Sequence, residues 1–124
     1  MNFKDKEQKI AMFREAFQNM MPANKLFGLI IEDFEEGYAK IRVPFKEDFI
    51  GDFIQRRWHG GILASIADTA GGLVGAVTLA SPVEKINTIN MRIDYLHGAK
   101  AVDIYAEATL VKNGKRVVNV DVKI

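Results

Sequence analysis

The residues best suited to chemistry lie in one stretch, where His59, Gly60 and Gly61 are followed by Asp68. A carboxylate such as that of Asp68 can activate water as a general base or attack an electrophile as a nucleophile. A Gly-Gly pair that opens a helix leaves backbone N–H groups unpaired at the positive end of the helix dipole, where they can bind an oxyanion. The stretch therefore combines a water-activating group with donors that can stabilise negative charge on a carbonyl oxygen.

These residues belong to an apolar stretch, 60–80, in which Asp68 is the only charge. The stretch is long enough to cross a bilayer, but a carboxylate near its middle costs about 2.5–3.5 kcal/mol on insertion scales, which favours a buried helix instead. Small or polar residues share one face of this helix: Gly61, Ser65, Asp68, Gly72 and Gly75. Two interpretations of this face remain, which are tight packing against another element and contact with a thin ligand.

The spacing along this helix constrains how its two chemical parts could cooperate. Gly60 and Asp68 are eight residues apart, so they lie about 12 Å apart along the helix axis. A carbonyl bound by the Gly60 amide cannot meet the Asp68 carboxylate of the same chain, because reacting groups must approach to about 3 Å. If both parts are catalytic, a second helix must run antiparallel to the first. A two-fold homodimer would supply one and would form two equal sites.

The elements that must position this helix are predicted from periodicity. An amphipathic helix is expected over 5–21, ended by Pro22, because apolar residues recur there at helical spacing. Strands are expected over 26–34, 38–45, 88–96, 102–110 and 118–124, and the aromatic-rich stretch 46–57 is expected to form a loop. Asn113–Gly114 predicts a hairpin with a type I′ turn. Together these patterns indicate one antiparallel sheet and one unusually apolar helix.

Composition excludes several classes of function. The chain has 124 residues, a net charge of +1, no cysteine and two histidines. Thiolate catalysis and cysteine-based metal sites are therefore excluded, and no metal site is expected. The balanced charge gives no reason to expect nucleic acid or an acidic membrane as a partner. The first nine residues have no signal-peptide pattern, so a cytoplasmic protein with a single domain, 1–124, is expected.

The run HGGILASIADTAGG, from His59 to Gly72, resembles the signature of the PaaI-like acyl-CoA thioesterases of the hotdog-fold superfamily. In that family an HGG turn opens the central helix, and an acidic residue follows nine positions after the histidine, as Asp68 does here. The resemblance continues through TINMRIDYL at 88–96 and the hairpin around Asn113–Gly114, and it covers roughly residues 25–124.

This resemblance implies an α+β hotdog fold, in which an antiparallel β-sheet wraps around a central apolar helix at about 60–80. The N-terminal helix would occupy 1–21 and the hotdog core 25–124. It also implies a homodimer or homotetramer with active sites at the subunit interface. The implied reaction is hydrolysis of a small- to medium-chain or aryl acyl-CoA to free acid and coenzyme A, without a cofactor. Relatives commonly continue into a further strand, so the last strand is expected to be absent or truncated at Ile124.

The resemblance also assigns roles by position. Asp68 would be the general base or nucleophile, the Gly60 amide would polarise the thioester carbonyl, His59 would support that turn, and the Thr88 hydroxyl would help to place the attacking water. Further residues are candidates for substrate binding on the helix face, in the loop before HGG, in an acyl pocket, or at the coenzyme A phosphates: Gly61, Ser65, Asp52, Gln55, Trp58, Arg92, Lys115 and Arg116. Plain core packing is an equal alternative for Trp58, and solvated surface charge is the alternative for Lys115 and Arg116.

Two other functions are compatible with parts of this pattern. A non-catalytic acyl-CoA-binding protein of the same fold would keep the amides at the helix start but would not need Asp68. A hotdog dehydratase would place a catalytic histidine against an acid from the central helix, and no matching histidine motif precedes the helix here. The presence of Asp68 therefore favours the thioesterase.

Overall fold

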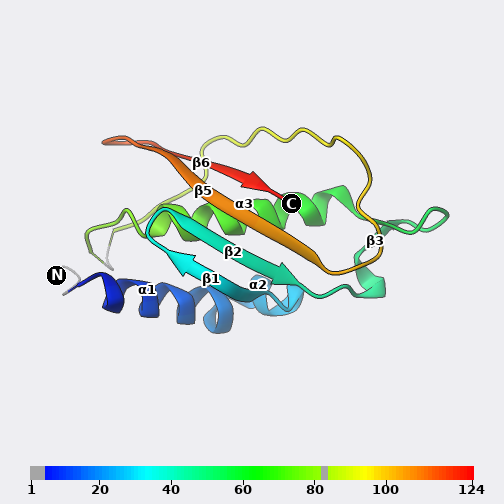
Figure 1. Cartoon of the computed structure of the whole chain (residues 1–124), viewed down its shortest axis with the longest axis horizontal. Coiled ribbons are helices and arrows are strands. Elements are labelled where there is room, and N and C mark those ends of the chain that lie inside the picture. The colour runs from blue at the N-terminus through cyan, green and yellow to red at the C-terminus, as the bar shows by residue number, and fades with distance from the viewer. Residues whose placement is uncertain (1–4, 82–83) are drawn as a thin grey trace.

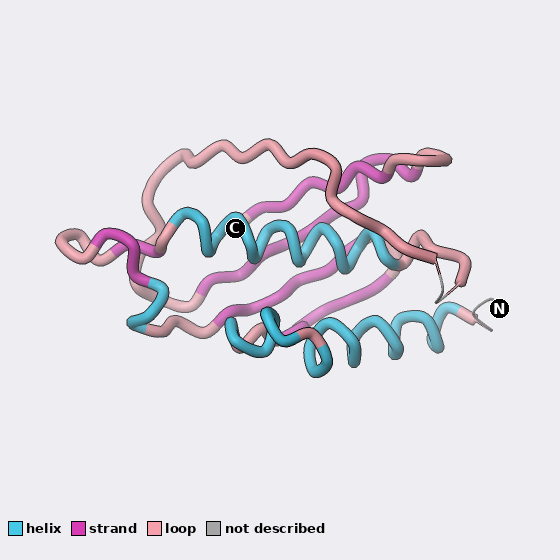
Figure 2. The backbone as a smooth tube through the Cα atoms, turned by 180° about the vertical axis from the view of Figure 1, so that it is seen from behind, coloured by secondary structure: helices cyan, strands magenta, loops and turns pink. Residues whose placement is uncertain are grey.

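The computed structural model of the chain describes residues 5–81 and 84–124. Its main sheet contains β1 (Ile30–Glu35), β2 (Tyr38–Val43), β5 (Ile104–Asn113) and β6 (Val118–Lys123), in the order β1-β2-β5-β6 with antiparallel neighbours. The long helix α3 (Gly60–Ala76) runs along one face of this sheet (Figure 1). Seen from behind, the N-terminal helices lie beside α3 on the same face (Figure 2). The predicted antiparallel sheet and central helix are confirmed.

The helix α3 is held against the sheet by its apolar side. Ile66, Leu73 and Val74 are at most 1% exposed and pack in one core with the inward-facing residues of β2 and β5. Burying a side chain of this size contributes about 1.5–3 kcal/mol, so this contact fixes where the helix lies. The helix ends before the predicted residue 80, because Thr78 binds the Gly75 carbonyl through both its N–H (3.0 Å) and its hydroxyl (2.6 Å).

The N-terminal region is longer and more broken than the single predicted helix. Its helical residues are α1 (Lys6–Glu15), a π-helical turn η1 (Ala16–Met20) and α2 (Pro22–Phe27), and residues 1–4 lie outside the described part. Pro22 does not end the helical region but begins α2, where its missing N–H costs no hydrogen bond. Gly28 then ends α2 in the left-handed conformation (φ 70°), so β1 starts at Ile30 and not at residue 26 as predicted.

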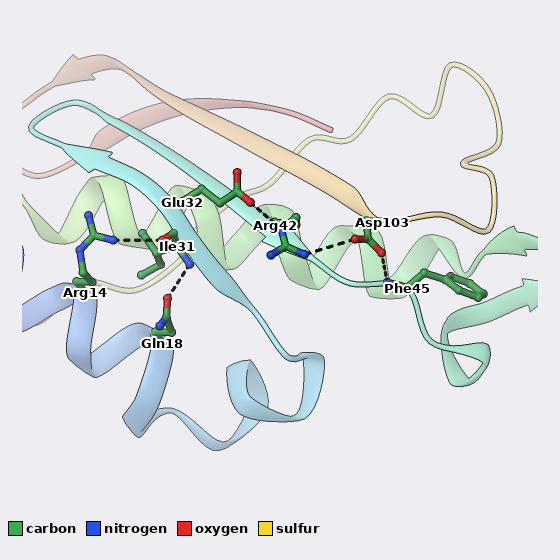
Figure 3. A network of polar contacts seen from close by, with 7 residues as sticks. All are labelled: Arg14, Gln18, Ile31, Glu32, Arg42, Phe45 and Asp103. Carbon is green, nitrogen blue, oxygen red and sulfur yellow. Dashed lines mark hydrogen bonds and ion pairs between the residues drawn. The ribbon is translucent and has the colours of Figure 1, made fainter.

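Side chains from the N-terminal region cover the free edge of β1 (Figure 3). Arg14 Nη1 donates to the Ile31 carbonyl at 3.2 Å, and the Ile31 N–H donates to Gln18 Oε1 at 2.7 Å. An edge strand otherwise presents unpaired backbone groups to which another strand can add. These two bonds satisfy one residue of that edge and hold η1 and α1 against the sheet.

A second polar network links three strands on the outer face of the sheet (Figure 3). Arg42 on β2 pairs with Glu32 on β1 at 2.6 Å and with Asp103, just before β5, at 3.4 Å. The other carboxylate oxygen of Asp103 accepts from the Phe45 N–H at 2.8 Å. The network therefore ties the ends of β1, β2 and β5 together on the face opposite α3.

The stretch 46–57, predicted as a loop, contains a short hairpin that leads directly into α3. Its elements are the 3-10 turn η2 (Glu47–Phe49), β3 (Ile50–Asp52) and β4 (Arg57–Trp58). The aromatic side chains pack beneath it as expected: Trp58 stacks on Phe49 with ring centroids 5.0 Å apart and meets Phe45 edge-on at 6.0 Å. Because His59 follows Trp58 directly, this aromatic cluster sets where α3 begins.

The hairpin between β5 and β6 is confirmed, but its turn differs from the predicted one. Strand β5 extends to Asn113 and β6 begins at Val118, so the connection is a four-residue loop, 114–117, and not a two-residue type I′ turn. The loop is closed by a bond from the Gly114 N–H to the Val117 carbonyl at 3.0 Å. A Cβ at Gly114 would lie 2.8 Å from that carbonyl oxygen, so close approach rather than a positive φ requires glycine here.

The predicted strand at 88–96 is wrong for this structure. The segment 84–97 forms no strand and runs as an extended arch beside α3 (Figures 1 and 2), with Ile89 and Leu96 76% and 86% exposed. Alternation shows which side chains share a face, but a strand also needs a partner for its backbone groups. Within residues 5–81 and 84–124, no helix combines the length and apolar character needed to cross a bilayer.

Candidate active site

Among the described residues, the start of α3 leaves one backbone amide without an acceptor. His59 is its N-cap: its Nδ1 accepts from the Gly61 N–H at 2.9 Å, and its carbonyl accepts from the Ile62 and Leu63 N–H groups at 3.1 and 3.2 Å. The Gly60 N–H has no acceptor among the residues that the structure describes. It lies at the positive end of the helix dipole and can donate to an oxygen that carries negative charge.

The turn that carries this amide is itself anchored. The His59 N–H donates to the Phe49 carbonyl at 2.8 Å, and the preceding Trp58 is bonded through its N–H to the Ala99 carbonyl at 3.0 Å. The indole Nε1 of Trp58 donates to the Val102 carbonyl at 2.9 Å. The side chain and backbone of His59 therefore support the turn in which Gly60 lies.

Asp68 lies on the exposed face of α3, turned away from the sheet. The Thr88 hydroxyl donates to its Oδ1 at 2.5 Å, so the structure brings Asp68 and Thr88 together. Its Oδ2 has no hydrogen-bond partner among the described residues and faces a cleft. A carboxylate held at one oxygen and free at the other is suited to accepting a proton from water.

The cleft beside Asp68 has a volume of about 2070 Å³ and lies between α3, the segment 84–97 and the β5–β6 hairpin. Ligand pockets for drug-sized molecules measure about 300–1,000 Å³, so this cleft has room for a long substrate or for part of a second chain. Arg92, Lys115 and Arg116, the residues predicted to meet phosphates, are exposed along its walls. Arg92 is also paired with Asp94 at 3.6 Å.

One half of the small-residue face of α3 is open, as contact with a ligand requires, and the other half is packed against neighbouring segments. Gly61, Ser65 and Asp68 are exposed, and the Ser65 hydroxyl donates to the Gly61 carbonyl at 3.0 Å. Further along the helix the face is covered: a Cβ at Gly72 would lie 3.8 Å from Phe17 Cε2, and one at Gly75 would lie 2.8 Å from Ile86 Cδ1. The half of this face around Asp68 is therefore open to a ligand, and the other half serves packing.

The remaining predicted binding residues lie in or near the β3–β4 hairpin. Asp52 Oδ1 accepts from the Ile54 and Gln55 N–H groups at 3.0 Å, so this carboxylate shapes the turn, and Gln55 is exposed at its tip. Trp58 is only 4% exposed, packs in the aromatic cluster and is not among the residues that line the cleft, and its role in substrate binding stays a prediction.

Two residues near the site were missed from the sequence. The Tyr95 hydroxyl donates to the Gly60 carbonyl at 2.7 Å. Asn24 is buried below α3, where its Nδ2 donates to the Phe17 carbonyl at 2.9 Å and its Oδ1 accepts from the Thr69 hydroxyl at 3.3 Å. Tyr95 stands in the TINMRIDYL run, but nothing in that run singles it out, and Asn24 stands in no motif; the bonds to Gly60 and Thr69 join segments far apart in sequence. In the described ranges, no three His, Asp or Glu side chains are grouped to hold a metal ion.

Comparison with known proteins identifies a family for this chain. The family model of the thioesterase superfamily matches residues 56–124. The medium/long-chain acyl-CoA thioesterase YigI of Salmonella typhimurium is 29% identical over 123 residues, covering 90% of this chain and 79% of the relative.

Solved structures show the same arrangement of elements. A Shewanella oneidensis protein related to the thioesterase superfamily superimposes with a TM-score of 0.79 at 26% identity, covering 91% of this chain and 82% of that one. The Escherichia coli PaaI protein from the phenylacetic acid degradation operon superimposes with a TM-score of 0.78 at 24% identity, covering 95% of this chain and 82% of that one. The chain therefore belongs to the thioesterase superfamily, and its fold is the predicted α+β hotdog fold.

Proposed function

We propose that this thioester hydrolase cleaves acyl-CoA thioesters to a free acid and coenzyme A. The observation that carries the proposal is the Gly60 N–H, which has no acceptor among the described residues at the start of a helix that also bears the exposed Asp68 carboxylate. The expected substrates are medium-chain acyl-CoAs, where the small- to medium-chain range expected from the sequence overlaps the medium/long-chain range named for the Salmonella relative. Aryl-CoA esters are the second class to test.

In the proposed reaction, Asp68 Oδ2 takes a proton from water while the water oxygen bonds to the thioester carbonyl carbon. The Thr88 hydroxyl holds Oδ1 and keeps the carboxylate oriented. The carbonyl oxygen becomes an oxyanion and accepts a hydrogen bond from the Gly60 N–H. The C–S bond then breaks, and the thiolate of coenzyme A leaves with the proton that Asp68 had accepted. A thioester carbonyl is electrophilic enough for one carboxylate and one backbone donor to carry this chemistry.

The proposed site is formed by two chains. Gly60 and Asp68 both lie in α3, about 12 Å apart along its axis, so one chain cannot present both to the same carbonyl. An antiparallel α3 from a second copy would place its Asp68 near the Gly60 amide of the first. The exposed apolar residues of the segment 84–97, such as Ile89 and Leu96, support an interface on this side. We propose a homodimer, alone or within a tetramer.

Two substitutions test the two chemical parts separately. Asp68→Asn should lower kcat about 10²–10⁴-fold, because it removes the general base. Gly60→Pro should lower kcat about 10²–10³-fold, because it removes the N–H and nothing else that α3 uses. Proline is compatible with this position: Gly60 is the first helical residue, and His59 already has the extended conformation (φ −66°, ψ 125°) that precedes proline.

The controls are Gly60→Ala, which keeps the N–H, and Asp33→Asn, which removes an exposed carboxylate on β1. Both should remain within about threefold of wild type in a thiol-release assay over acyl- and aryl-CoAs. Mixing Asp68→Asn with Gly60→Pro should restore activity, because a mixed dimer contains one intact site. Turnover by the Asp68→Asn variant at the wild-type rate would contradict the proposal, and tight binding of CoA esters without any turnover would identify a binding protein instead.

A further inference from the structure

Tyr95 contacts the first turn of α3 at the proposed oxyanion donor. Its hydroxyl donates to the Gly60 carbonyl at 2.7 Å. Its ring lies against the same residue, because a Cβ added at Gly60 would be 3.4 Å from Cε1 and 3.5 Å from Cζ and the hydroxyl oxygen. The ring therefore occupies the space next to the backbone of Gly60, and the hydroxyl binds its carbonyl.

The bond from Tyr95 completes a pair of restraints on one peptide group. The Gly60 carbonyl and the Gly61 N–H belong to the same planar peptide. Tyr95 binds its oxygen, and His59 Nδ1 binds its N–H at 2.9 Å. Two consecutive glycines have the greatest backbone freedom of any pair of residues. A Gly-Gly turn that must present one amide in a fixed direction therefore needs restraints from outside, and the structure supplies them at both ends of the peptide.

The free amide is separated from this restrained peptide by a single Cα atom. With the Gly60–Gly61 peptide fixed on one side and the His59 N–H bound to the Phe49 carbonyl on the other, the Gly60 N–H retains little freedom to turn. An oxyanion donor acts through its direction, because it must be aimed in advance at the oxygen on which charge develops. A small rotation of this amide would reduce stabilisation of the transition state more than it reduces the affinity for substrate.

We infer that Tyr95 is a positioning residue for the reaction, acting through the Gly60–Gly61 peptide to aim the Gly60 N–H at the thioester carbonyl. This inference rests on the proposed function of Gly60. It assigns two tasks to the segment 84–97, since Thr88 orients Asp68 and Tyr95 orients the turn at Gly60. In the proposed dimer, Gly60 and Asp68 of one chain serve different sites, so one segment 84–97 would contribute to both.

The test is Tyr95→Phe, which removes the hydroxyl and keeps the ring. The matched control is Tyr38→Phe, which removes the same kind of hydroxyl at the beginning of β2 on the sheet. We expect Tyr95→Phe to lower kcat on the best acyl-CoA about three- to tenfold, with KM within about twofold and Tm unchanged. The control should leave all three quantities at their wild-type values. A purely structural role for the hydroxyl would instead lower Tm and leave kcat per folded molecule unchanged.

A second measurement does not depend on activity. In ¹⁵N–¹H spectra, Tyr95→Phe should shift the Gly60 and Gly61 amide resonances and speed hydrogen exchange at Gly61, whereas Tyr38→Phe should not. Wild-type kcat in Tyr95→Phe, or a raised KM with unchanged kcat, would overturn the inference and leave the proposed function standing. If the wild-type protein cleaves no acyl-CoA, the proposed function fails, and unchanged glycine resonances in Tyr95→Phe would separately overturn the positioning role.

Discussion

The helix α3 lies between two neighbours of opposite character. On one flank the N-terminal helices pack closely, with Phe17 beside Gly72 and the buried Asn24 joining the Phe17 carbonyl to the Thr69 hydroxyl. On the other flank the segment 84–97 lines the cleft and packs on α3 where Ile86 meets Gly75, and among the described residues its hydrogen bonds to α3 come from the Thr88 and Tyr95 hydroxyls. We call these the closed flank and the open flank (Figure 2).

The difference shows how one helix serves both stability and chemistry. On the closed flank the polar groups are buried and bonded, so they hold α3 in place and face no substrate. On the open flank Asp68, Thr88 and Tyr95 are exposed, and the bonds from Thr88 and Tyr95 each end on a residue of the proposed site. Substitutions on the closed flank should therefore change stability, and those on the open flank should change kcat.

The largest effect on stability is expected from Asn24→Ala. The substitution leaves the Phe17 carbonyl and the Thr69 hydroxyl without their buried partner, which should lower the free energy of unfolding by about 1–3 kcal/mol. Chemical denaturation measures this, and kcat per folded molecule should stay within about twofold. Adding Thr69→Val removes one of the two groups that Asn24→Ala leaves without a partner. The free energy of unfolding of the double variant should therefore fall by less than the sum of the decreases in the two single variants. A stability loss confined to Thr69→Val would contradict this account of the closed flank.

Thr88→Val on the open flank should have the opposite signature. Valine keeps the shape of threonine but cannot donate to Asp68 Oδ1, so we expect kcat to fall about three- to tenfold. The free energy of unfolding should change by less than about 0.5 kcal/mol, because Thr88 is exposed. Thr109→Val, an exposed position on β5, is the matched control for both assays. If Thr88→Val lowered stability as much as Asn24→Ala does, the distinction between the flanks would fail.

The smallest effect concerns the exposed end of the closed flank, where Lys6 on α1 meets Glu36 in the β1–β2 turn at 2.7 Å. The hydrogen bond from Lys6, aided by its charge, lowers the pKa of Glu36 below its ordinary 4.5. The pair therefore stabilises the fold above the unfolded-state pKa of Glu36 and loses this contribution as pH falls through the lower folded-state pKa. Lys6→Met should lower Tm by about 1 °C at pH 7 and by less at pH 3. An equal difference at both pH values would show that the ion pair is not its cause.

The parts of the fold that follow local rules could be predicted from the sequence. The apolar stretch with a single charge predicted α3, and alternation predicted β2, β5 and β6 to within a few residues. The HisGlyGly start of α3 was recognisable because N-caps and helix openings depend on neighbouring residues. His59 does act as the N-cap, although only the Gly60 N–H, and not a set of amides, is left free among the described residues.

The parts that depend on contacts between distant segments could not be predicted. The residues 88–96 alternate like a strand, but periodicity carries no information about whether a partner edge lies within hydrogen-bonding distance. Tyr95 looked like one more residue of that strand, and its bond to the Gly60 carbonyl spans 35 positions. Asn24 looked like a polar residue beyond a helix end, and its burial depends on where α3 lies 45 positions later.

The two bonds of the open flank also decide where the chain can change in length. Thr88 and Tyr95 are seven residues apart, enough to span about 23 Å when extended, while their partners Asp68 and Gly60 are about 12 Å apart along α3. One extra residue between Thr88 and Tyr95 would enlarge the arch and leave both bonds in reach. One extra residue between Gly60 and Asp68 would turn Asp68 by about 100° around the helix and carry it away from Thr88. Insertions and deletions among related chains should therefore accumulate in the arch and be absent from the nine residues that join the two ends of the site.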